Sequence, residues 1–142
     1  MIEVLKIALS QYGVTEIVGG EHNPTILKYF KDIGHSWVKD DEMAWCSAFV
    51  NWCCFHAGKN YTGELNARSW LKVGHRAVEP QVGDIVVFWR EKESGWKGHV
   101  GFYINETEDY INVLGGNQSN QVKIAAYPKH RLLQYRRVNS LK

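Results

Sequence analysis

The chain has 142 residues, of which 44% are hydrophobic and 13% aromatic, and its 17 basic and 15 acidic residues leave a net charge of +2. A chain of this length and apolar content can bury a core, which excludes a disordered protein and favours one domain over residues 1–142. The basic stripe of a nucleic-acid-binding protein is missing, and no apolar stretch reaches the roughly 18 residues of a membrane helix.

The first half of the chain has the apolar spacing of helices. We expect helices over residues 1–12, 24–33, 43–57 and 66–73. Asn23 suits the N-cap of the second helix, and Pro24 suits its first position. The acidic residues 40–42 precede the third helix, where negative charge interacts favourably with the helix dipole.

After residue 74 the pattern changes to runs of β-branched and aromatic residues, which favour strands. We expect five strands, over residues 85–89, 100–104, 110–114, 121–126 and 132–138. Because the helices come first and the strands follow, the sequence predicts an α+β fold with an antiparallel sheet of about five strands. The chain shows no repeat and no linker.

Cys46 lies near the start of the third predicted helix, in the sequence Ala44-Trp45-Cys46-Ser47-Ala48-Phe49. A thiol attacks a carbonyl as the thiolate, and the positive end of a helix stabilises that anion. Cys46 is therefore a candidate nucleophile. A free cysteine is also a common small core residue, and position alone does not separate these two interpretations.

Cys53 and Cys54 lie about two turns further along the same helix. We expect both to be core residues, as free cysteines usually are. A zinc site with His56 is the alternative, but adjacent cysteines on a helix point about 100° apart. No second pair with ligand spacing exists, so we expect no metal and no cofactor.

His99 is the best candidate base among the six histidines. It begins a predicted strand directly after a glycine and a polar loop, where a rigid element can hold an imidazole over a cleft. The other histidines lie in loops or near the ends of elements, where solvated or capping roles are more common. They are His22, His35, His56, His75 and His130.

A catalytic cysteine–histidine pair often has a third residue that orients the imidazole. Asn117, in the turn after the predicted 110–114 strand, is our first choice, and Asn112 and Gln118 are alternatives. Asn117 also suits a turn with left-handed backbone. Backbone N–H groups at the start of the Cys46 helix are free to stabilise an oxyanion.

Five segments follow one another in a characteristic order. They are Asp41–Cys53, Ala67–Leu71, Pro80–Phe88, Gly98–Tyr103 and Val113–Gln118. This order resembles the NlpC/P60 and CHAP superfamily of cysteine peptidases and amidases, and more narrowly its small phage- and prophage-type members with the pattern GHVGF…LGGNQ. The resemblance covers roughly residues 35–138. Asp84 matches a recurrent residue of the family, which we interpret as a structural turn aspartate.

The resemblance implies a papain-like fold, in which the nucleophile helix packs on an antiparallel sheet that carries the histidine. It implies hydrolysis of a peptide or amide bond in peptidoglycan through a thioester. Carried over by position, Cys46 is the nucleophile, His99 the base and Asn117 the orienting residue. The third position varies within the superfamily.

Several functional alternatives stay open. The bond could be the N-acetylmuramoyl–L-alanine amide, the bond between D-Glu and the diamino acid, or a cross-bridge peptide bond. A silent wall-binding module and a thiol acyltransferase on the same fold are rival functions. The loops at residues 61–66 and 91–97 are expected to shape the pocket.

Six tryptophans are many for a chain of this length, and some should line a substrate groove. Trp45, Trp96 and Trp70 are the candidate substrate-binding residues, although Trp45 fits a core position equally well. Trp52 and Trp89 are expected in the core.

The N-terminus shows no basic start followed by a long apolar run, so no signal peptide is visible. We therefore expect a protein made in the cytoplasm that acts on the cell wall or periplasm after release or delivery. A bacteriolytic phage endolysin, a delivered toxin and the catalytic domain of a larger protein fit this pattern. The expected partner is peptidoglycan, with a delivery or immunity protein as a further option, and the expected state is a monomer.

Overall fold

The computed structural model describes residues 2–17, 22–39 and 44–141. Its helices are α1 (Ile2–Ser10), α2 (Pro24–Lys31), α3 (Cys46–His56) and the 3-10 helices η1 (Ala67–Lys72) and η2 (Lys129–Arg131). Asn23 caps α2 as expected, because its side chain accepts a hydrogen bond from the backbone N–H of Thr25. The acidic residues 40–42 and Met43 lie outside the described residues.

Helix α3 begins at Cys46, three residues later than the sequence predicts. Trp45 has φ −124° and ψ 15°, which is not helical, and it serves as the N-cap. Cys46 is therefore the first helical residue, and its own N–H is one of the groups that have no partner within the helix. This start places the thiol at the positive end of the helix dipole.

The sheet has six strands, one more than predicted, and every pair is antiparallel. The strands are β1 (His75–Arg76), β2 (Ile85–Trp89), β3 (Gly98–Glu106), β4 (Tyr110–Gln118), β5 (Gln121–Pro128) and β6 (Leu132–Arg137), in the order β1-β6-β2-β3-β4-β5. The additional strand β1 has two residues and pairs with the end of β6. The predicted order of helices followed by an antiparallel sheet is confirmed.

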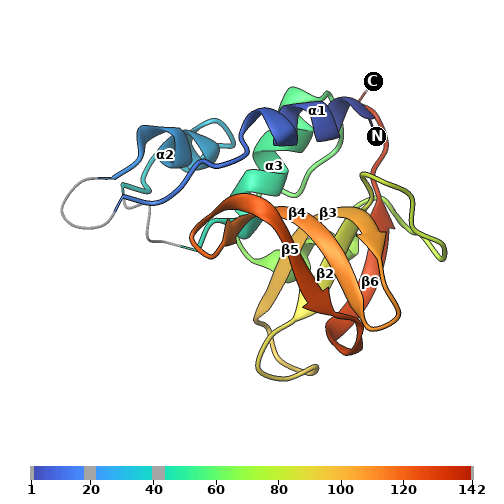
Figure 1. Cartoon of the computed structure of the whole chain (residues 1–142). Coiled ribbons are helices and arrows are strands. Elements are labelled where there is room, and N and C mark those ends of the chain that lie inside the picture. Colours follow the sequence, from blue (N-terminus) through green and yellow to red (C-terminus); the bar gives the residue numbers. More distant parts are fainter. Residues whose placement is uncertain (1, 18–21, 40–43, 142) are drawn as a thin grey trace.

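Helices α1, α2 and α3 lie on one side of a strongly curved sheet (Figure 1). The main core lies between α3 and the sheet, where α3 contacts β3 and β4. A second core fills the other face of the sheet, with Val86, Phe88, Tyr103, Ile111 and Val113 at its centre. Apolar residues cover most of α3 because the helix is buried along nearly its whole length.

The close approach of β4 to α3 depends on Gly116. A Cβ atom at this position would lie 2.7 Å from the Phe49 Cβ and 2.8 Å from the Trp45 ring. Any larger residue would push the strand away from the start of α3. The glycine therefore lets the end of β4 reach the region of Cys46.

Asp84 is a structural residue, as the sequence indicates. It is fully buried at the start of β2, and its carboxylate accepts hydrogen bonds from Arg137 at 2.8 and 2.7 Å. The same carboxylate accepts the Gln81 N–H at 2.7 Å and so closes the turn. None of the helices in the described part of the chain is long and apolar enough to span a membrane.

Candidate active site

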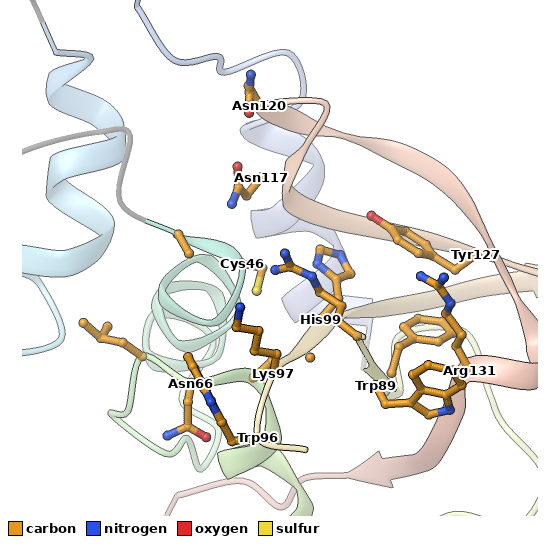
Figure 2. A pocket seen from close by; sticks show the side chains of 16 residues that line it. Cys46, Asn66, Trp89, Trp96, Lys97, His99, Asn117, Asn120, Tyr127 and Arg131 are labelled. Atoms are coloured by element: carbon orange, nitrogen blue, oxygen red, sulfur yellow. The ribbon is translucent and has the colours of Figure 1, made fainter. Parts of the chain in front are cut away.

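A cleft of about 570 Å³ opens where the start of α3 meets the sheet (Figure 2). Its lining comes from the start of α3, from η1 and the loop before it, from the β2–β3 hairpin, from the end of β4 and the turn after it, and from β5 and η2. The lining residues are Ala44, Cys46, Leu65, Asn66, Ala67, Phe88, Trp89, Arg90, Trp96, Lys97, Gly98, His99, Asn117, Asn120, Tyr127 and Arg131. Cys46, His99 and Asn117 all lie in this one cleft.

The Cys46 thiol lies at the base of the cleft and is 7% exposed. Burial raises the pKa of the Cys46 thiol, whereas the backbone N–H groups of Val100 and Ser47, the Arg90 charge and its own N–H lower it. Val100 follows His99 on β3, so the hydrogen bond from its N–H places the Cys46 sulfur beside this part of the strand. These N–H groups also form a ready cradle for negative charge.

His99 is the second residue of β3 and lies opposite Phe88 on β2. The imidazole is 7% exposed and stacks on the Tyr127 ring, with centroids 4.7 Å apart and planes 21° apart. Tyr127 stacks in turn on Phe88, with centroids 5.1 Å apart. Burial is the main cause that lowers the pKa of His99 to about 4, and the Arg90 charge acts in the same direction.

The imidazole is oriented by Gln118. His99 Nε2 lies 2.8 Å from Gln118 Oε1, and the Gln118 amide nitrogen donates to the carbonyls of Val113 and Lys123 at 3.0 and 2.7 Å. Both donors of the amide are used, so its oxygen must face the ring and accept the Nε2 proton. The Nδ1 atom is then the unprotonated nitrogen, which is the one able to take a proton.

Asn117 does not make the hydrogen bond to the His99 imidazole that the sequence predicts for it. Asn117 has φ 57° in the turn after β4 and lines the cleft, whereas the hydrogen bond to His99 comes from Gln118. Asn112, the other alternative, donates to Asn105 on β3. The structure therefore favours Gln118 over Asn117 as the orienting residue.

The resting state of the pair is a neutral thiol beside a neutral imidazole. Burial moves the two pKa values apart, upward for the Cys46 thiol and downward for the His99 imidazole. Forming the ion pair before substrate binds would place two charges in a desolvated site. The geometry therefore suits transfer of the thiol proton to Nδ1 as attack begins.

Two of the three predicted substrate-binding tryptophans are core residues. Trp45 and Trp70 are fully buried and donate their indole N–H groups to Glu16 and Ser47, at 2.9 and 3.1 Å. That prediction is wrong for both, because the Trp45 ring at the N-cap of α3 and the Trp70 ring within η1 both pack into the core. Trp96 is 73% exposed and lines the cleft as expected.

Trp89 also departs from its predicted place. It was expected in the core, but it is half-buried and lines the cleft, with the Arg131 guanidinium 5.4 Å from the centre of its ring. Trp52 is buried as expected, and its indole N–H donates to Asp32.

The remaining thiols lie in the core. Cys53 and Cys54 are fully buried, as predicted, and burial raises the pKa of each thiol. Within residues 2–17, 22–39 and 44–141, no group of three or more histidine, cysteine or acidic side chains is arranged to hold a metal ion.

A buried hydrogen-bond network fixes one rim of the cleft. Asn51 on α3 donates to the carbonyls of Ser47 and Glu64, each at 3.0 Å, and accepts the N–H groups of Thr62 and Gly63 at 2.9 and 2.8 Å. The Ser47 hydroxyl donates to the same Glu64 carbonyl at 2.7 Å. The loop before η1 is thus tied to the first turns of α3.

Basic side chains gather at the cleft in a way that the sequence alone does not reveal. Arg90, Lys97 and Arg131 line it, and no carboxylate does so among the described residues. Lys97 is paired with Glu91 at 2.6 Å, outside the lining. In the sequence, these residues look like ordinary solvated charges at the ends of strands.

Comparison with known proteins identifies the family and the fold of this chain. Residues 38–117, more than half of the chain, match the family model of the CHAP domain. One solved structure with the same fold comes from Staphylococcus aureus subsp. aureus Mu50, and its protein is described as "similar to lipoprotein, NLP/P60 family". It has a TM-score of 0.52 and is 18% identical to this chain. A comparison with curated proteins gives no match.

The structural likeness covers 94% of this chain, which spans 40% of the length of the staphylococcal protein. At that identity the likeness concerns the fold, and the predicted papain-like α+β fold is confirmed. The family match includes Cys46, His99 and Asn117 and ends one residue before Gln118. The chain belongs to the CHAP domain family, within the NlpC/P60 and CHAP superfamily that its sequence resembles.

Proposed function

We propose that this protein is a peptidoglycan hydrolase that cuts a peptide or amide bond with Cys46 as the nucleophile. The observation that supports this most strongly is a helix-start thiol and an imidazole in one cleft, with the imidazole hydrogen-bonded to the buried Gln118 amide. The description of the similar staphylococcal protein places that protein in the NLP/P60 family, which belongs to the same superfamily.

Acylation follows from the protonation states of the site. The Cys46 thiol proton passes to Nδ1 of His99 while the sulfur attacks the scissile carbonyl carbon. The carbonyl oxygen becomes an oxyanion, which N–H groups at the start of α3 stabilise. The C–N bond then breaks, the departing amine takes the proton from Nδ1, and the acyl group stays on Cys46 as a thioester.

Deacylation returns the enzyme to its starting state. A water molecule loses a proton to Nδ1 of His99 as its oxygen attacks the thioester carbonyl. The C–S bond breaks, the sulfur regains the proton, and a carboxylic acid leaves. Gln118 keeps the Nε2 proton in place through both steps, and the Tyr127 ring shields the imidazole from water.

The proposal is tested by the products released from purified sacculi. Mass spectrometry of the soluble fragments should show a new free amine and a new carboxylate at one kind of amide or peptide bond. The identity of that bond separates an amidase from an endopeptidase. Transfer of the acyl group to an added amine instead of water would indicate an acyltransferase, and cleavage of the glycan strands alone would contradict the proposal.

A further inference from the structure

Arg90 is one of three basic residues at the cleft to which the proposed mechanism gives no role. It follows β2 directly, and its backbone N–H donates to the Lys97 carbonyl at 3.1 Å, which closes the β2–β3 hairpin. Its side chain is exposed and lines the cleft. Among the described residues, no hydrogen bond or ion pair engages its guanidinium.

The position of Arg90 is set by sheet register. Phe88 and His99 are opposite each other on β2 and β3, and Arg90 lies two residues beyond Phe88 on the same face of the hairpin. Its charge acts on the pKa values of Cys46, His99 and Tyr127. Arg90 lines the same cleft as Cys46, His99 and Tyr127, so its guanidinium faces the site that holds the reacting groups.

The two other basic residues of the cleft, Lys97 and Arg131, differ in whether a carboxylate pairs with them. Lys97 is paired with Glu91 at 2.6 Å, whereas Arg131 lies over the Trp89 ring without a carboxylate partner in the described part of the chain. The whole sequence is nearly balanced, with 17 basic and 15 acidic residues. Two unpaired guanidinium groups in one cleft therefore form a local anion-binding feature.

We propose that Arg90, together with Arg131 in the same cleft, binds a free carboxylate of the substrate within one residue of the scissile amide. This inference rests on the proposed function and narrows its substrate class to peptides that carry such a carboxylate. A guanidinium matches a carboxylate through two parallel hydrogen bonds, which gives both attraction and orientation. Stem peptides offer this group on D-Glu and on the diamino acid, and some carry a neutral carboxamide in its place.

The experiment compares synthetic stem peptides that differ only in carboxylate against carboxamide, first at D-Glu and then at the diamino acid. The wild-type enzyme should cleave the carboxylate member of at least one pair about 10 to 100 times more efficiently, by kcat/KM. Arg90→Gln should remove that preference by slowing the carboxylate peptide alone. Arg90→Lys should restore part of it, because charge returns without the planar fork.

Arg76→Gln is the matched control, since Arg76 is exposed on β1 and does not line the cleft. Binding of the same peptides to Cys46→Ala, followed by NMR, gives a second readout that needs no turnover. A similar ratio of affinities, abolished by Arg90→Gln, would support the subsite even if hydrolysis were not seen.

Two results separate the subsite from the proposed function. Equal cleavage and equal binding of both members of both pairs, or an Arg90→Gln variant that slows both members alike, would overturn the carboxylate subsite. In that case the proposal that Cys46 hydrolyses an amide bond would be unaffected. Failure to cut any amide in peptides or sacculi would overturn the proposed function, and the binding ratio would then decide the subsite alone.

Discussion

Gln118 determines which nitrogen of His99 can accept a proton. Its side-chain oxygen lies 2.8 Å from Nε2 of His99, and its amide nitrogen is held by the carbonyls of Val113 and Lys123. A Cβ at Gly115 would lie 2.5 Å from that oxygen, so the glycine leaves room for the amide. The imidazole is thereby presented with Nδ1 free.

Gln118→Leu should lower kcat on a peptide substrate by roughly 100-fold or more, because the ring loses the partner that fixes its tautomer. Steady-state kinetics on a soluble stem peptide measures the loss. Leucine also leaves two backbone carbonyls without their donor, so the free energy of unfolding should fall by about 1–3 kcal/mol.

The matched comparison for Gln118→Leu is Asn117→Gly, which removes the adjacent side chain and tolerates the positive φ. It should reduce kcat much less than Gln118→Leu does. A larger loss in Asn117→Gly, with both proteins folded, would return the orienting role to Asn117.

His99 should make the protein less stable in mild acid. Its pKa falls from an ordinary 6.5 to about 4 in the folded state, so the unfolded chain binds more protons between these values. Stability is retained above pH 6.5 and declines as the pH falls toward 4, by about 3 kcal/mol from this residue. Urea unfolding at a series of pH values measures the slope.

His99→Gln supplies the comparison for that slope. The variant should lose the His99 contribution and keep the slope of the other titrating groups. If wild type and His99→Gln lose stability equally between pH 6.5 and 4, the buried neutral imidazole is not the cause.

The neutral thiol and imidazole also predict the shape of the pH–rate profile. Because kcat/KM reports the free enzyme, its acid limb should follow His99 and lie near pH 4 instead of near 6.5. The alkaline limb should lie above the ordinary thiol pKa of 9.0, since burial raises the pKa of Cys46. Circular dichroism must show a folded protein at each pH, and an acid limb near 6.5 would contradict this assignment.

Sequence patterns were sufficient to predict the helices and most strand positions, and they singled out Cys46 and His99, which line one cleft. They could not choose between Asn117 and Gln118, because β4 and β5 shift register between Gly115 and Gln118. Such a shift changes which face each residue presents, and spacing along the chain does not reveal it.

The cleft walls were harder to predict than the nucleophile. Trp45, which suited the groove and the core equally, lies in the core, whereas Trp89, expected in the core, lines the cleft. Burial depends on which way a ring points from the end of an element. Tyr127 and Arg90 reach the site through sheet pairing, not through nearness in sequence. A single sequence carries no direct signal for such contacts.

The central claim is that Cys46 forms the acyl bond, and the rate of amide cleavage by Cys46→Ala tests it most directly. The substitution removes one sulfur at a residue that is 7% exposed, so circular dichroism should show an unchanged fold. Release of new amine groups from purified sacculi should fall to the uncatalysed background in Cys46→Ala and remain unchanged in Cys54→Ala, if that variant is folded. Release at the wild-type rate by folded Cys46→Ala would contradict the account.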